Sequence, residues 1–385
     1  MDRQTDRRSF VLGTVGATAA ASSAAAQSQE IRTAHIGVGS RGGSLLRQTL
    51  KQSNVRITAI CDIDPQARDS ALSAAASHNP KQVNDWRAVL DLKDVDAVFL
   101  GTPCDLHSPM SAACLEAGKY VYCEKPLGIT PEQIATVLRA AAKSKAFLQI
   151  GQQLRYFPSM RTAIKEIHGG IAGQTYIIKA HRHSGRGRAK PGAPEPSAQE
   201  KTRRAWYADV KRSGDLIVEN AVHNIDACNW IANSRPVSAY GHGKKYFPKP
   251  IPPGTVMMDA FSVEYIYENG MHCDYSQISF HPRQLKTLPS GMWYTVFGEK
   301  GSVWVTHSSA TFYDQYGESE PRLLVPAGTD ESDNATEEFL ACIREKRQPF
   351  ADIKVGAVAA LTAIMGRESI YKGRSVTWKE LGVEV

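Results

Sequence analysis

The segment Gly37–Gly42 limits most strongly what this chain can fold into. It reads Gly-Val-Gly-Ser-Arg-Gly, a GxGxxG motif that ends an apolar run, Ala34–Gly37, and opens a helical pattern, Gly42–Lys51. In a strand-turn-helix unit the first glycine permits a tight turn, the second lets the backbone approach a pyrophosphate, and the third lets helix and strand pack closely. The helix N-terminus adds partial positive charge. The motif therefore predicts a dinucleotide site, with these contacts: Gly37, Gly39, Ser40, Arg41 and Gly42.

An acidic residue stands where such a unit binds the adenosine ribose. Asp62 follows a second apolar run, Val55–Ile60, and lies 20 residues after Gly42. A carboxylate there accepts hydrogen bonds from the ribose hydroxyls and repels the 2'-phosphate of NADP. Arg41 favours the opposite choice, because a guanidinium beside the adenosine can pair with that phosphate. We expect NAD as the cofactor, with NADP as the alternative.

The rest of the chain divides into two patterns. Up to about residue 150, short apolar runs alternate with helical patterns, as in a parallel sheet with crossover helices. Beyond Gly151 the apolar runs are longer and some are joined by short turns, as in an antiparallel sheet. At 385 residues the chain is long enough for two domains. We expect an α/β Rossmann domain at 27–150 and an α+β domain with an open, mainly antiparallel sheet at 151–385.

The second domain is expected to contain strands, flanking helices and one long polar connection. The strands are predicted at Tyr176–His183, Phe261–Tyr267, His272–Phe280, Trp293–Phe297 and Val303–His307, and the helices at Leu216–Trp230, Ala335–Lys346 and Val355–Tyr371. The last helices are able to pack back on the Rossmann domain. The polar stretch 182–211 is too long for a structural turn, which makes it a candidate lid or specificity loop.

The first 26 residues are typical of an export signal. Arg7 and Arg8 begin a twin-arginine pattern, and a weakly apolar run and the small residues Ala24–Ala26 follow it. We expect cleavage after Ala26 and export by the twin-arginine (Tat) machinery to the periplasm or another compartment outside the cytoplasm. Because this route carries folded proteins, a cofactor can be loaded before export.

Composition argues against several other classes of protein. No run of about 18 apolar residues offers a membrane span. The formal net charge is only +7, and the basic run that begins at Arg182 lacks interleaved aromatic residues, so we expect a solvated or anion-facing loop and no nucleic-acid binding. The seven cysteines have no CxxC spacing and mostly lie in apolar runs, which indicates buried thiols and neither a zinc site nor a disulfide framework.

Two further segments carry a family resemblance. Thr102-Pro103 with His107, followed by Ala117–Leu127 with the sequence AGKYVYCEKPL, resembles the TPxxxH and AGKHVxxEKPL signatures of the glucose-fructose oxidoreductase / inositol dehydrogenase / MocA family. The resemblance implies a Rossmann domain followed by an open sheet that forms the substrate site and often the oligomer interface, which here implies a homo-oligomer. It also implies cofactor contacts at Thr102, Pro103, His107, Glu124 and Lys125.

The resemblance assigns chemistry to particular residues. Lys125 is the family position beside the nicotinamide and the substrate hydroxyl, and its bond to Pro126 would often be cis. Gly214–Asp226 resembles the family helix that carries an acidic residue, three intervening residues and a histidine. These two positions are Glu219 and His223, and the family commonly has aspartate at the first of them. Because the two residues are four apart, we expect them to share a helix face, where the carboxylate can orient the imidazole.

The chemistry of these residue types is independently reasonable. Oxidation of a secondary alcohol needs a base that takes the hydroxyl proton as the hydride leaves carbon. A lysine near the positively charged nicotinamide could have a lowered pKa and serve as that base, and a neutral His223 could receive or return the proton. Arg155 and Tyr156 follow the last Rossmann strand, where substrate contact and interdomain packing are equally good interpretations.

These residues predict an NAD(P)-dependent oxidoreductase that acts on a secondary hydroxyl of a sugar, glycoside or polyol and holds its cofactor tightly. One alternative is a redox-neutral glycosidase or lyase that acts through a transient keto-sugar at the same site. A second is a non-catalytic sugar-binding protein on the same fold. A metal site that joins His181 and His183 to Glu219 and His223 is a minor alternative, because hydride transfer needs no metal.

Overall fold

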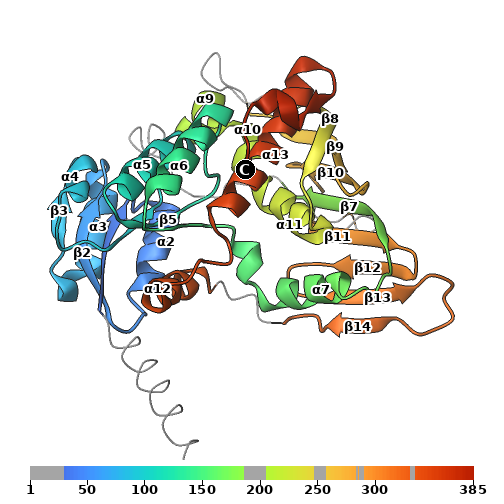
Figure 1. Cartoon of the computed structure of the whole chain (residues 1–385), viewed down its shortest axis with the longest axis horizontal. Coiled ribbons are helices and arrows are strands. Elements are labelled where there is room, and N and C mark those ends of the chain that lie inside the picture. Colours follow the sequence, from blue (N-terminus) through green and yellow to red (C-terminus); the bar gives the residue numbers. More distant parts are fainter. Residues whose placement is uncertain (1–29, 186–204, 247–256, 283–284, 286–289, 330–333) are drawn as a thin grey trace, which may run out of the picture.

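The structure is a computed structural model that describes residues 30–185, 205–246, 257–282, 285, 290–329 and 334–385. The predicted export signal at 1–26 lies outside these residues. In the described part of the chain the strands form two sheets, which lie beside each other in Figure 1. No helix in this part is both long enough and apolar enough to cross a membrane.

The first sheet confirms the predicted Rossmann fold. Its strand order is β3-β2-β1-β4-β5-β6 and its strands pair in parallel. The strands are β1 (Ile31–Ile36), β2 (Val55–Cys61), β3 (Lys81–Val83), β4 (Ala97–Leu100), β5 (Tyr120–Cys123) and β6 (Leu148–Ile150). Strands β4 and β6 are buried at every position, as expected of strands covered on both faces.

Helices connect these strands and cover the sheet (Figure 1). They are α2 (Ser40–Thr49), α3 (Pro65–Ala74), α4 (Arg87–Leu90), α5 (Cys104–Glu116) and α6 (Pro131–Lys143). The start of α6 follows from its sequence, since Thr130 accepts a hydrogen bond from the Gln133 amide and Pro131 occupies the first turn. The chain thus returns after each crossover to place the next strand in parallel, which brings the carboxyl ends of the strands to one edge.

The second sheet is mixed and mainly antiparallel, as predicted. Its order in the described residues is β14-β13-β12-β11-β7-β10-β9-β8-β15, and only the pair β7 and β10 is parallel there. The strands are β7 (Thr175–His183), β8 (Pro236–Lys244), β9 (Ala260–Tyr267), β10 (His272–Ile278), β11 (Gly291–Gly298), β12 (Gly301–Val305), β13 (Ala310–Asp314), β14 (Arg322–Val325) and β15 (Val376–Thr377). The helices of this half are α7 (Pro158–His168), α9 (Val210–Ser213), α10 (Asp215–Glu219), α11 (Val222–Ala232), α12 (Ala335–Glu345) and α13 (Ile353–Lys372).

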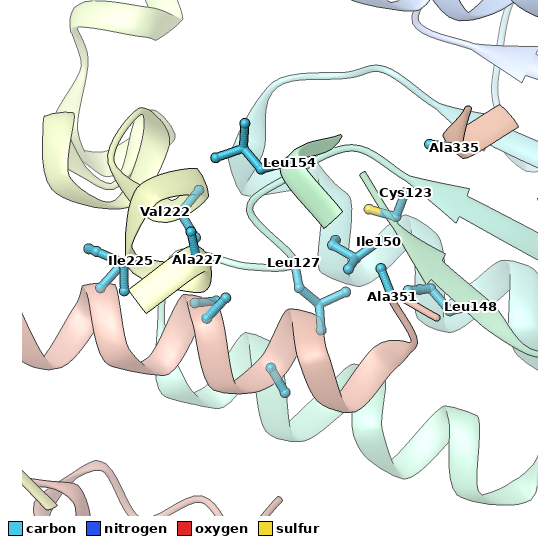
Figure 2. Packing of buried hydrophobic residues seen from close by; sticks show 14 of the residues in the cluster. Cys123, Leu127, Leu148, Ile150, Leu154, Val222, Ile225, Ala227, Ala335 and Ala351 are labelled. Atoms are coloured by element: carbon cyan, nitrogen blue, oxygen red, sulfur yellow. The ribbon is translucent and has the colours of Figure 1, made fainter. Parts of the chain in front are cut away.

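The C-terminal helices join the two halves. The Gln149 side chain of β6 donates to the Ala335 carbonyl at the start of α12, and the Ile150 amide donates to the Ala351 carbonyl just before α13. Phe339 of α12 packs edge-on against aromatic rings of the first sheet, among them Phe99. Figure 2 shows apolar side chains from both halves in one cluster around α13, including Leu127, Ile150, Leu154, Val222 and Ile225. The edge of the Rossmann sheet is therefore fixed against the second half by one shared core.

Two predictions about elements need correction. The single helix expected over Leu216–Trp230 is wrong, because α10 ends at Glu219 and α11 begins at Val222. The list for the second domain was incomplete, because the strands β8, β13, β14 and β15 and the helices α7 and α9 were not predicted. The expected buried thiols are confirmed, since all seven cysteines are free and buried.

Candidate functional site

The glycine loop between β1 and α2 has the shape of a pyrophosphate cradle. Gly37 has φ +77, and a Cβ added to Gly42 would lie 1.7 Å from the Gly37 carbonyl oxygen. A Cβ on Gly39 would meet nothing within 4 Å, so the loop is open on that side. Gly39 caps α2 without a side-chain hydrogen bond, and the first turn of the helix carries no acidic residue. Free amides and partial positive charge at this end suit an anionic pyrophosphate.

Asp62 is held beside this loop. Its Oδ2 accepts a hydrogen bond from the Val38 amide at 2.7 Å and its Oδ1 accepts one from the Asp64 amide at 2.8 Å. Arg41 extends elsewhere, since its Nε donates to Glu124 Oε1 at 2.7 Å. Asp62 therefore lies at the position predicted to bind the ribose. Arg41, which was expected to favour NADP, is instead paired with Glu124. The residues present fit NAD.

Thr102, Pro103 and His107 occupy the end of β4 and the start of α5. Gly101, just before Thr102, packs against the glycine loop, since its added Cβ would lie 2.7 Å from the Gly37 carbonyl oxygen. His107 is buried behind the loop, with Nε2 at 2.8 Å from the Thr102 carbonyl and Nδ1 at 2.7 Å from the Pro126 carbonyl. Burial lowers the pKa of His107, although both carbonyls oppose the shift. His107 therefore connects the loop at Thr102 to the loop at Pro126 through hydrogen bonds inside the protein.

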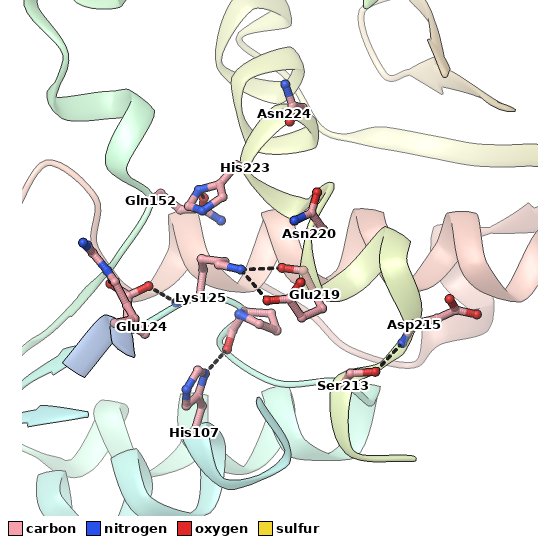
Figure 3. A network of polar contacts seen from close by, with 12 residues as sticks. His107, Glu124, Lys125, Gln152, Ser213, Asp215, Glu219, Asn220, His223 and Asn224 are labelled. Atoms are coloured by element: carbon pink, nitrogen blue, oxygen red, sulfur yellow. Dashed lines mark hydrogen bonds and ion pairs between the residues drawn. The ribbon is translucent and has the colours of Figure 1, made fainter. Parts of the chain in front are cut away.

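Lys125 follows β5 and forms an ion pair with Glu219 of the second half. Lys125 Nζ lies 2.9 Å from Glu219 Oε1 and also donates to the Glu219 main-chain carbonyl, as Figure 3 shows. The Lys125-Pro126 bond is cis, as the resemblance implied. Burial alone would lower the pKa of Lys125, but the Glu219 carboxylate outweighs it and the net shift is upward. Without a nucleotide, Lys125 is therefore a cation, in contrast to the lowered pKa considered from the sequence.

His223 lies beside Lys125 in Figure 3, at the start of α11. Its Nδ1 is 3.1 Å from Gln152 Oε1. Burial, followed by the charges of Lys125 and Arg182, holds the pKa of His223 well below its ordinary value. The imidazole is therefore neutral, and with Gln152 Oε1 as the acceptor its proton sits on Nδ1, which leaves the Nε2 lone pair free to take a proton.

Glu219 and His223 do not share a helix face, because the helix breaks between them. Glu219 is the last residue of α10, and His223 is the second residue of α11. The Lys125 ammonium takes the Glu219 carbonyl that the His223 amide would use in a continuous helix. The structure thus brings Lys125, Glu219 and His223 together, but the partner of Glu219 is Lys125 and the partner of His223 is Gln152.

Arg155 and Tyr156 lie outside this cluster. Both are buried; Arg155 forms a two-point ion pair with Asp226 at 2.7 and 2.9 Å and stacks over the Trp230 ring. The Tyr156 hydroxyl accepts a hydrogen bond from the Ala351 amide. Of the two interpretations left open by the sequence, these contacts favour packing over substrate contact, but the packing lies within the second half of the chain.

The structure does not bring the four residues of the metal-site alternative together. His181 and His183 lie on the face of β7 that bears Lys179, whereas the intervening Arg182 faces α11, where it reaches Asn224. No group of three or more potential ligands that could hold a metal ion occurs among the described residues. The two histidines instead contact Ser276 and pack against Trp293 on the outer face of the sheet.

Sequence reasoning missed several side chains in the cleft. Gln152 was not among the predicted site residues, yet it holds His223, and its buried Nε2 has no partner among the described residues. Tyr207, in a helical turn at 205–208, lies close to Glu219; burial and that carboxylate raise its pKa. Tyr207 and Arg182 both belong to the stretch 182–211, whose length and basic run were the signals that could have pointed to them.

The chain matches two sequence models of one family. The model described as "Oxidoreductase family, NAD-binding Rossmann fold" matches residues 31–152, and the "GFO/IDH/MocA C-terminal domain" matches residues 160–304. An inositol 2-dehydrogenase of Salmonella typhimurium is 29% identical over 250 residues, which are 62% of this chain and 67% of that protein. A glycosyl hydrolase family 109 protein of Stenotrophomonas maltophilia is 27% identical over 247 residues, 58% of this chain but only 54% of that protein.

Solved structures agree in fold. A levoglucosan dehydrogenase in complex with NADH and L-sorbose superposes with a TM-score of 0.75 at 18% identity and covers 92% of this chain and all of its own. An oxidoreductase domain protein from Kribbella flavida gives a TM-score of 0.76 at 21% identity, covering 91% of this chain and 99% of its own. The two family matches leave only residues 153–159 between them, so the chain belongs to the Gfo/Idh/MocA oxidoreductase family, with the family's NAD-binding Rossmann fold at its N-terminal end.

Proposed function

We propose that this protein is an exported dehydrogenase that holds NAD tightly and oxidises a secondary hydroxyl of a sugar, glycoside or polyol. The observation that carries the proposal is that Lys125, paired with Glu219, and His223, bonded to Gln152, lie side by side. His223 is held neutral, while Lys125 is held as a cation by Glu219. Oxidation of an alcohol needs a base that accepts the hydroxyl proton and a positive charge that stabilises the oxygen as it loses the proton.

The roles of the side chains follow from these states. NAD, when bound, supplies the acceptor for the hydride that leaves the substrate carbon. The hydroxyl proton passes to His223 Nε2, because Nδ1 faces Gln152 Oε1. The Lys125 ammonium stabilises the negative charge that develops on the substrate oxygen, and Glu219 keeps that ammonium charged and in place. The names of the inositol and levoglucosan dehydrogenase relatives support a polyol or sugar as substrate.

The proposal is tested by replacing the two central residues in protein loaded with NAD. Lys125→Ala and His223→Ala should each lower turnover by roughly 10²-fold or more, while the dinucleotide stays bound. Turnover is followed as reduction of the bound or added nicotinamide with a panel of sugars and polyols. Near-wild-type turnover in both variants would remove these residues from the mechanism. A wild-type protein that binds sugars but reduces no nicotinamide would favour the non-catalytic alternative.

A redox-neutral reaction is the second candidate, and the family 109 glycosyl hydrolase relative is the observation that favours it. In such a reaction the hydride is borrowed from a sugar carbon, elimination or hydrolysis follows at the keto-sugar stage, and the hydride returns. The two candidates differ in their cofactor balance. Release of an aglycone from a glycoside with no net change in nicotinamide absorbance would support the second candidate, whereas stoichiometric reduction would exclude it.

We also propose that the protein is a homo-oligomer that pairs through the outer face of the second sheet. Four large side chains on this face are exposed: Tyr240, Ile266, Phe297 and Tyr313. The strand register aligns the last three of them, through His272 and Ile177, in one row across the sheet. An exposed row of this kind is typical of an interaction surface. Export by the Tat route remains part of the proposal on the evidence of Arg7, Arg8 and Ala24–Ala26.

A further inference from the structure

Arg182 is a cation close enough to His223 to act on its pKa, and the proposed chemistry does not use it. It lies near the end of β7, opposite Gln277 of β10 and Met292 of β11, and it faces α11. Its Nη1 is 3.5 Å from Asn224 Oδ1 and 3.9 Å from the Met292 sulfur. Both contacts are long and both partners are neutral, and within the described part of the chain they engage only one nitrogen of the guanidinium.

The other cations of this region all have carboxylate partners. Arg41 pairs with Glu124, Lys125 with Glu219 and Arg155 with Asp226. No carboxylate of the described residues lies within ion-pair distance of Arg182, although its side chain is only partly exposed. A partly desolvated guanidinium is normally paired. Among the described residues of this region, Arg182 is therefore the cation without a carboxylate partner.

This charge acts on the residues that are proposed to do the chemistry. Arg182 contributes to the lowered pKa of His223 and opposes the upward shift of the pKa of Tyr207. The side chains nearest to it are neutral amides: Asn224, and Gln277 opposite it, which donates to Asn220. Figure 3 shows Asn220 and Asn224 on the same side of the cluster as His223. Amides suit sugar hydroxyls, whereas a guanidinium matches a carboxylate with two parallel hydrogen bonds.

We propose that Arg182 selects a substrate that bears a carboxylate, so that the substrate is an acidic sugar, a uronate or an aldonate. The inference rests on the proposed dehydrogenase function. The carboxylate binds the Arg182 guanidinium, a hydroxyl near it meets the partly exposed amide of Asn220, and the reacting hydroxyl faces His223 and Lys125. Arg182 is thus a specificity residue, and the substrate carboxylate is its ion-pair partner.

The test compares acidic sugars with their neutral parents in the NAD-loaded, full-length protein. Glucuronate is compared with glucose, galacturonate with galactose, and gluconate with glucitol. We expect kcat/KM to favour the acids by about 10-fold to 100-fold, mainly through KM, the size expected of a charge-assisted hydrogen bond. Arg182→Gln should abolish this preference and Arg182→Lys should keep part of it. Arg235→Gln is the matched control, because Arg235 pairs with Glu268 at the protein surface.

A second readout does not depend on turnover. The same acids should raise the Tm of the NAD-loaded wild-type protein at concentrations where the neutral sugars do not, and Arg182→Gln should lose this shift. A preference for neutral sugars, or an acid preference that Arg182→Gln leaves unchanged, overturns the inference and leaves the dehydrogenase proposal standing. If no sugar of either kind reduces the nicotinamide, the dehydrogenase proposal fails, and the Tm shifts still decide whether Arg182 binds a carboxylate.

Discussion

Glu219 determines the charge of Lys125, and this gives a residue-scale prediction. Burial lowers the pKa of Lys125, while the carboxylate raises it above the ordinary lysine value of 10.5. Glu219→Gln removes the largest opposing charge and leaves the burial, so the pKa of Lys125 should fall relative to the wild type. If the ammonium is needed for turnover, the alkaline limb of the kcat/KM profile should move to lower pH in the variant.

The acid limb of the same profile serves as an internal control. It reports His223, which must be neutral to accept a proton and whose lowered pKa places that limb below 6.5. Glu219 is not among the causes of the shift in His223, so Glu219→Gln should leave the acid limb in place. Glu116→Gln, at the exposed C-terminal end of α5, is expected to leave both limbs unchanged. Movement of the acid limb alone in Glu219→Gln would mean that the carboxylate acts on His223 after all.

Asp62 gives a second prediction at this scale. Its carboxylate is fixed at the ribose position by the Val38 and Asp64 amides, whereas Arg41 is held by Glu124. Asp62→Ser keeps a ribose hydrogen-bonding group and removes the charge that repels a 2'-phosphate. We expect the ratio of NADP to NAD affinity to rise by about 10-fold or more, measured by titration calorimetry. Tighter binding of NADP than NAD by the wild type would contradict this role and give weight to Arg41.

At the scale of elements, two glycines of one loop make a matched pair. Gly42→Ala places a methyl group against the Gly37 carbonyl, so the turn between β1 and α2 must shift, at a cost of about 1–3 kcal/mol or more. Gly39→Ala adds the same methyl group where the protein leaves open space. Gly42→Ala should therefore lower Tm, whereas Gly39→Ala should keep Tm near the wild-type value and weaken NAD binding by about 10-fold or more. Equal NAD affinity in Gly39→Ala and wild type would show that the pyrophosphate lies elsewhere.

Sequence patterns predicted correctly those helices and turns whose structure depends on residues close to them in the chain. They failed where contacts with residues far away in the chain determine the structure. The strand-turn-helix unit at Gly37–Gly42 and the start of α6 follow from local rules of turns and caps. The break between α10 and α11 depends on Lys125, which lies 94 residues earlier and takes a helix carbonyl. Strand β8 was missed because Gly241 interrupts its apolar pattern, yet a side chain there would collide with Val263.

The same distinction holds for the site. The motifs and the family resemblance identified Lys125, Glu219 and His223, which the structure brings together. They could not assign partners, because the pairing of Lys125 with Glu219 and of His223 with Gln152 depends on how two halves of the chain meet. The sequence also could not show which arginines are paired with a carboxylate. In the structure Arg155 pairs with Asp226, whereas Arg182 contacts the amide of Asn224.

At the scale of the whole molecule, the cofactor site is bounded by both halves. Lys125 belongs to the loop after β5 of the first sheet, whereas Glu219 and His223 come from α10 and α11 of the second half. Helices α12 and α13 fix the two halves to each other through β6 (Figure 1). A dinucleotide that runs from the glycine loop to Lys125 would thus be held by a rigid site with its pyrophosphate on backbone amides, which favours slow release.

Slow release matters because of the compartment proposed for this protein. A protein exported in its folded state can carry NAD out of the cytoplasm, where no comparable pool replaces it, so the cofactor must be reset in place by a second substrate or by return of the hydride. We expect protein recovered from the periplasm and dialysed without cofactor to retain close to one dinucleotide per chain, measured in the supernatant after denaturation, and to complete one half-reaction. A variant with Arg7→Lys and Arg8→Lys, purified from the cytoplasm, should have the same occupancy, since loading precedes export. Periplasmic protein that is empty and works only with continual addition of NAD would exclude a captive cofactor and leave the fold and the catalytic proposal intact.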